Sequence, residues 1–83
     1  MASIVEDIKF AEESIGGEFP SVASMLRYVA AINAEATRKE FVEACVAAGY
    51  KANTATNRFY ESRKAWIQDF GGTMDKEGRY HEA

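Results

Sequence analysis

A pair of helical patterns joined by a very short turn, between Thr37 and Lys64, constrains the fold of this chain most. Thr37-x-x-Glu40 is a capping box, in which the threonine hydroxyl and the glutamate carboxylate each accept a backbone amide at the start of a helix. Gly49 is expected to end that helix, because a residue without Cβ turns left-handed at low cost. Asn53 is the expected N-cap of the next helix. Since only three residues separate Gly49 from Asn53, the two helices must cross sharply.

Both helices carry an apolar stripe at helical spacing, which predicts the faces that they bury. The first stripe comprises Phe41, Val42, Cys45, Val46 and Ala48. The second stripe comprises Ala55, Phe59, Ser62, Trp66 and Phe70, and its three aromatic residues are expected in the core. Amide, hydroxyl and basic side chains share the first turns of the second helix, where base-edge contacts require them.

This stretch resembles the helix-turn-helix motif of small DNA-binding proteins of bacteria, plasmids and phages, and the resemblance covers about a third of the chain. Four residues carry it: Cys45 as the small residue, Gly49 in the turn, the apolar Tyr50 after it, and Ala55 early in the second helix. The chain departs from the motif at one place, where the later apolar residue is Phe59 and not the preceding Arg58.

The resemblance implies that the second helix enters the major groove of double-stranded DNA. Base-edge contacts are predicted for Thr54, Thr56 and Asn57, and Asn53, in the same first turns, is included among the DNA-binding residues. Phosphate contacts are predicted for Arg38, Lys39, Lys51, Arg63 and Lys64. Arg58 suits either purpose, and Tyr60 either packs on its neighbours or contacts a phosphate. The competing interpretation is an ordinary solvated face behind a capped first turn.

The distribution of charge favours nucleic acid more than the net charge of −3 does. Residues 37–68 hold six lysine and arginine side chains against three glutamates, whereas residues 1–36 hold two cations against six acids and residues 69–83 hold two against four. Phosphate binding depends on local potential, so a basic face on an acidic protein can dock on DNA.

The sequence predicts an all-α domain of four helices over residues 1–72, with the helix-turn-helix at 37–70. Ser3-x-x-Glu6 begins the first helix and Gly16-Gly17 ends it, while Ser21 after Pro20 begins the second. Their expected buried faces are Ile4, Ile8, Ala11 and Ile15 in the first helix and Val22, Met25, Leu26, Val29 and Ile32 in the second. So short a chain has a modest core, which favours a homodimer through these two helices.

Residues 73–83 form a polar tail. A hairpin across Thr73 to Tyr80, turning at Glu77-Gly78, would make a wing beside the second motif helix. The segment lacks alternating apolar residues, so disorder is the favoured expectation.

The remaining residues argue against other classes of protein. No catalytic pair, phosphate loop or cofactor motif is recognisable, so we expect no enzyme and no cofactor. His81 has no cysteine or second histidine beside it, which argues against a metal site. Cys45 is expected to be buried in a reducing cytosol, and neither a signal peptide nor a membrane-spanning run is recognisable, which predicts a cytoplasmic protein.

Two functions therefore stay open. The first is a sequence-specific DNA-binding protein, acting as a small transcriptional regulator or as the DNA-recognition part of a phage or plasmid process. The second is a small acidic adaptor or inhibitor that binds a protein partner through the acidic N-terminal helices, over Glu6 to Glu18.

Overall fold

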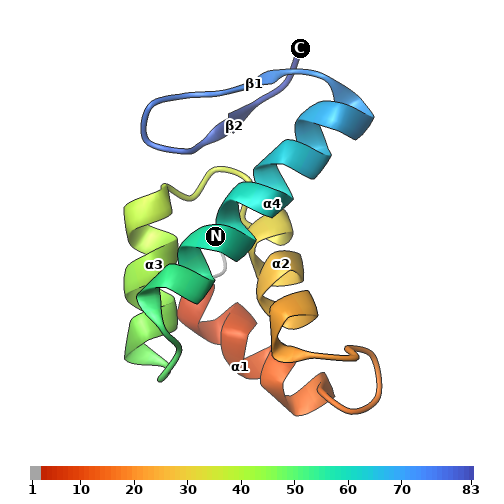
Figure 1. Ribbon diagram of the computed structural model, residues 1–83, viewed down its shortest axis with the longest axis vertical. Helices are drawn as coiled ribbons and strands as arrows, with labels where there is room; N and C mark the ends of the chain where they lie inside the picture. The colour runs from red at the N-terminus through yellow and green to blue at the C-terminus, as the bar shows by residue number, and fades with distance from the viewer. Residues whose placement is uncertain (1–2) are drawn as a thin grey trace.

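The computed structural model describes residues 3–83 and confirms the all-α class with four helices (Figure 1). They are α1 (Ile4–Ser14), α2 (Val22–Ile32), α3 (Arg38–Ala47) and α4 (Ala52–Phe70), and a two-stranded antiparallel hairpin follows them, β1 (Thr73–Met74) and β2 (Tyr80–His81). The longest helix, α4, packs on both α2 and α3, which flank it in Figure 1, while α1 packs on α2 and α3. The domain is therefore organised around α4.

Hydroxyl side chains begin three of the four helices, as the sequence predicts. Ser3 and Ser21 accept the amides of Glu6 and Ser24, each at 3.1 Å. Thr37 forms the complete capping box with Glu40. The prediction for α4 is wrong by two residues, because its N-cap is Lys51 and Asn53 already lies inside the helix. Lys51 makes no side-chain cap bond, so the start of α4 is fixed by the turn before it.

That turn is a Schellman motif centred on Gly49. The amide of Tyr50 donates to the carbonyl of Cys45 (2.9 Å), and the amide of Gly49 donates to that of Val46 (3.0 Å). Gly49 has φ of +100°, in the left-handed region that favours glycine. Tyr50 then packs against the core. This geometry fixes the direction in which the chain enters α4.

The core lies where the four helices meet. Its buried residues are Ile8, Ala11, Met25, Leu26, Val29, Ala30, Phe41, Cys45, Ala55 and Phe59. The rings of Phe41 and Phe59 join α3 to α4, with centroids 5.6 Å apart. Burial raises the pKa of the Cys45 thiol to about 11, so the thiol is protonated at neutral pH.

Several residues predicted to be buried lie at the ends of their helices and are exposed. Phe70 is 67% exposed and Trp66 is half-buried, because the last turns of α4 extend beyond α2 and α3. The ring of Trp66 packs instead between Phe70, at the end of α4, and Tyr80 of the hairpin. The other exposed members of the predicted stripes are Ile15, Val22, Ile32, Val46 and Ala48.

The C-terminal segment is an ordered hairpin, so the expectation of disorder is wrong. Polar contacts, and not alternating apolar residues, stabilise the hairpin. One carboxylate oxygen of Asp75 accepts the amides of Glu77, Gly78 and Arg79 at 2.9–3.0 Å, which closes the turn. The amide of Tyr80 donates to the carbonyl of Ala34 (2.9 Å), which attaches the hairpin to the α2–α3 loop.

Glycine at position 78 lets the hairpin lie directly on the core. Its φ is +102°, and a Cβ at this position would stand 2.8 Å from the ring of Phe59. The carbonyl of the preceding Glu77 accepts the amide of Arg38, the first residue of α3 (2.8 Å). The hairpin therefore covers the end of the bundle where α3 begins (Figure 1).

Arg63 is buried at the junction of α4, α2 and the hairpin, with 1% of its surface exposed. Its guanidinium donates to four carbonyls: Ala30 (2.6 Å), Asn33 (2.9 Å), Ala36 (3.1 Å) and Gly78 (2.8 Å). It also stacks on the ring of Phe59, with Cζ 4.3 Å from the centroid. Burial lowers the pKa of Arg63 to about 10, which leaves it protonated at neutral pH. The predicted phosphate contact by Arg63 is therefore wrong.

We predict that Arg63→Ala lowers the free energy of unfolding by at least about 3 kcal/mol, because each hydrogen bond to a charged donor contributes about 1.5–3 kcal/mol. Urea denaturation followed by circular dichroism measures this difference. Lys64→Ala is the matched control, since Lys64 is exposed, and it should change stability by less than about 0.5 kcal/mol. Equal stabilities for the two variants would contradict a structural role for Arg63.

The hairpin should loosen in acid. The hydrogen bond from His81, followed by the three amide bonds, lowers the pKa of Asp75 from 3.8 to about 2. A carboxyl with a lowered pKa stabilises the folded state fully above its unfolded value and loses that contribution as the pH falls through about 2. The amide NMR signals of Glu77 and Gly78 should therefore shift between pH 4 and pH 2. In Asp75→Asn this acid-dependent change should be missing.

Candidate nucleic-acid interface

The surface of α4 opposite its buried stripe is polar and exposed. We define the α4 outer face as Asn53, Asn57 and Lys64, with Lys51 just before the helix, and all four side chains are exposed. Asn53, Asn57 and Lys64 lie opposite Ala55, Phe59 and Ser62 because the positions differ by about half a turn of an α-helix, and Lys51 precedes the first turn. Packing against α2 and α3 leaves this face uncovered within residues 3–83, so it is open to a ligand.

The first turns of α4 hold fewer free polar groups than the sequence predicts. Thr56 is half-buried, and its hydroxyl donates to the carbonyl of Ala52 (2.8 Å). Thr54 is also half-buried, and its amide donates to the side-chain oxygen of Asn53 (2.9 Å). Asn57 makes no side-chain hydrogen bond in the described part of the chain. The amide oxygen of Asn53 is thus engaged, whereas the side-chain amide of Asn57 has no partner among the described residues.

On the α3 side of α4, Arg38 and Tyr60 lie together. The guanidinium of Arg38 donates to the Tyr60 hydroxyl (2.6 Å) and lies over the tyrosine ring, 5.9 Å from its centroid. Lys39, the next residue of α3, is exposed. The sequence allows Tyr60 either to pack on its neighbours or to contact a phosphate. In the structure its hydroxyl accepts a hydrogen bond from Arg38 at the surface. This pair joins the beginning of α3 to the middle of α4.

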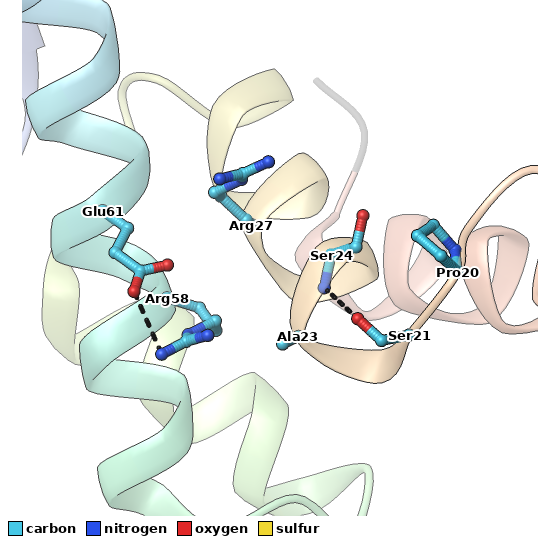
Figure 2. Close-up of a pocket in the computed structure, with 7 residues that line it drawn as sticks. All are labelled: Pro20, Ser21, Ala23, Ser24, Arg27, Arg58 and Glu61. Atoms are coloured by element: carbon cyan, nitrogen blue, oxygen red, sulfur yellow. Dashed lines mark hydrogen bonds and ion pairs between the residues drawn. The ribbon is translucent and has the colours of Figure 1, made fainter.

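On the α2 side, Arg58 is paired with Glu61 at 3.0 Å (Figure 2). Phe59 takes the buried position, which places Arg58 at the edge of the helix, where it is partly covered. Because the apolar residue is Phe59 and not residue 58, Arg58 faces α2. Arg58 does not share the α4 outer face with Asn57 and Lys64.

The cations that remain at the surface outnumber the free acids between residues 37 and 68. Within residues 3–83, Arg38, Lys39, Lys51 and Lys64 have no carboxylate partner. Among the acids, Glu61 pairs with Arg58, whereas Glu40 accepts only the neutral amide and hydroxyl of Thr37 and keeps its charge. This leaves Glu40 and Glu43 as the carboxylates without a cation partner among the described residues of this segment, against four such cations. The surface of this segment therefore keeps the excess of positive charge that the sequence predicts, even though Arg63 is buried.

Arg27 is a cation near α4 that the sequence reasoning did not select. It belongs to α2 and lines the same surface cleft as Arg58 and Glu61 (Figure 2). The helix-turn-helix pattern begins ten residues after it, so the motif carries no signal for this position. The one available hint is that Arg27 is the only arginine in the acidic segment 1–36.

Comparisons of the chain with protein-family models, with curated proteins and with solved structures found no match. The part of the chain that the structure describes contains no cluster of three or more histidine, cysteine, aspartate or glutamate side chains placed to hold a metal ion. Across residues 3–83, none of the helices combines the length and the apolar character that crossing a membrane requires.

Proposed function

We propose that this protein binds double-stranded DNA through the α4 outer face and the beginning of α3. The observation that carries the proposal is the set of four exposed cations without carboxylate partners, Arg38, Lys39, Lys51 and Lys64, at the beginning of α3 and along α4, the helix that also exposes the amide of Asn57. Cations position a protein on phosphates, and an asparagine amide can pair with the adenine edge in the major groove. Both kinds of group are needed for sequence-specific binding, and both lie on these two helices.

The dimensions of α4 support the same proposal. Lys51 and Lys64 are separated by about 20 Å along the helix axis at about 1.5 Å per residue. An α-helix fits the major groove, which is about 12 Å wide, so Asn57 can approach base edges while cations before and after it approach the backbone. In this arrangement the N-terminal half of α4 enters the groove, since the hairpin lies toward its other end (Figure 1).

The proposal includes a biological role of the kind that such proteins have: a small cytoplasmic regulator of transcription, or the DNA-recognition part of a phage or plasmid process. A homodimer would place two α4 helices one DNA turn apart. The expected dimer surface on α1 and α2 is smaller than the sequence predicts, because Ile8 is buried within one copy, although Ile15 is exposed. Sedimentation at micromolar concentration, with and without duplex DNA, tests the dimer.

A second candidate function is an acidic adaptor that binds a protein partner through α1. One observation favours it. Phe10 is 60% exposed on α1 and lies on the same side as Glu6 and Glu13, four residues before and three residues after it. An exposed aromatic ring between carboxylates suits a partner that presents an apolar pocket with basic surroundings.

We predict different effects for two variants of the α4 outer face. Asn57→Ala should lower the affinity for a selected specific site by about 1–3 kcal/mol and leave binding to random duplex unchanged. Lys64→Ala should weaken binding to all sequences alike and reduce the slope of log affinity against log salt by about one. Mobility-shift titrations at several salt concentrations, after selection of a site from a random duplex pool, measure both quantities.

Phe10→Ser is the control for the adaptor function, because it removes the exposed ring of α1 and leaves α4 unchanged. It should bind DNA as the parent does. If the parent protein shows no salt-dependent binding to any duplex, the DNA proposal fails and the adaptor function becomes the better account of the chain.

A further inference from the structure

The geometry points to a second phosphate-binding site, in the cleft between the beginning of α2 and the middle of α4, that receives a backbone phosphate of bound DNA. The cleft has a volume of about 310 Å³. Its residues come from the loop before α2, from α2 and from α4: Pro20, Ser21, Ala23, Ser24, Arg27, Arg58 and Glu61 (Figure 2). This inference rests on the proposed function, since it names a further contact of the same helix.

Two guanidiniums from different helices line this cleft. Arg27 comes from α2 and is exposed, while Arg58 comes from α4 and is partly covered. Guanidiniums are the side chains best suited to phosphate, because their planar donors match two phosphate oxygens at once.

The donors of Arg58 are incompletely used. Its Nη2 pairs with Glu61, but its Nε is buried and has no hydrogen-bond partner among the described residues. A buried N–H without an acceptor is costly, and native structures rarely leave one. If the Arg58 side chain turned outward from Glu61 into the cleft, a phosphate oxygen would supply the acceptor that this Nε lacks.

The first turn of α2 adds to the positive potential of the cleft. Ser21 caps this helix and Ala23 lies in its first turn, and both line the cleft. The first amides of a helix lack partners within the helix, and the helix dipole makes this end positive. No acidic residue occupies the first turn of α2. Glu61 is the one carboxylate among the lining residues, so the cleft carries an excess of positive charge.

The place of this cleft on α4 explains why it would meet DNA. Tyr60 faces α3 and bonds to Arg38, whereas Arg58 faces α2. Residues two apart on a helix point about 200° apart, so Arg38 and the cleft lie on opposite sides of the α4 outer face. The major groove is bordered by the phosphates of two strands. A helix inserted there with cations on both flanks would contact one strand at Arg38 and the other at Arg27 and Arg58.

The test is a salt titration of binding to random duplex DNA by Arg27→Gln and Arg58→Gln. Each variant should bind roughly tenfold more weakly near 0.1 M salt and should reduce the salt slope by about one, as loss of one phosphate contact requires. Lys9→Gln is the charge-matched control, because Lys9 is an exposed cation of α1 outside the cleft, and it should keep the parent slope. Glu61→Gln should strengthen binding, since it frees Arg58 from its carboxylate.

Thermal unfolding establishes that the variants are folded, and the exposed Arg27 keeps the test valid if Arg58→Gln unfolds. If the parent binds duplex and Arg27→Gln keeps the parent's slope of log affinity against log salt, this inference is overturned while the proposed function stands. If the parent binds no duplex, both fail. A parallel titration with inorganic phosphate, followed by the amide NMR signals of Ser24 and Arg27, separates the possible sources. Saturable shifts in a protein that binds no duplex would identify a free-phosphate site and overturn the DNA contact.

Discussion

The guanidinium of Arg63 is the interaction on which the arrangement of the helices depends. It reaches from α4 to the carbonyls of Ala30 and Asn33 at the end of α2, to Ala36 in the loop before α3, and to Gly78 in the hairpin. The last carbonyls of a helix have no partners within it, and the helix dipole makes that end negative. A buried cation is therefore stabilised here without a carboxylate. One side chain satisfies carbonyl groups from three separate segments and holds them against α4.

This interaction also determines which surface of α4 stays open. Because Arg63 and Phe59 point into the bundle, Asn53, Asn57 and Lys64 point outward, and the neighbouring Arg58 and Tyr60 lie at the two edges of the helix. The hairpin completes the arrangement at the other end, where Gly78 rests on Phe59 and Glu77 accepts the first amide of α3. The structural core and the proposed DNA-binding surface are thus two faces of one helix.

The charges of the protein are separated by these contacts in a way that its acidic composition conceals. Glu61 is neutralised by Arg58, whereas Arg38, Lys39, Lys51 and Lys64 have no carboxylate partner within residues 3–83, so positive charge is in excess on α3 and α4. On a different helix, α1, the acids Glu6 and Glu13 lie on the same side as the exposed Phe10. The two proposed functions therefore use different surfaces, and one protein has the means to carry both a basic and an acidic face.

The four helices and the starts of three of them follow from the sequence alone, because caps such as Ser3, Ser21 and Thr37 and the glycine at position 49 act through hydrogen bonds and backbone angles only a few residues apart. The sequence also placed most of the core, since helical spacing marks Ile8, Leu26, Phe41 and Phe59. It failed where the decisive partner is distant in the chain. Arg63 reads as a surface cation until the carbonyls 27–33 residues before it are brought together. The sequence of the hairpin is that of a polar tail, and its order depends on contacts with Ala34 and Phe59. Phe70 continues the apolar stripe of α4, but it is exposed because α4 is longer than the helices beside it. These three cases depend on the folded arrangement, because burial is set by the segments that pack beside a residue.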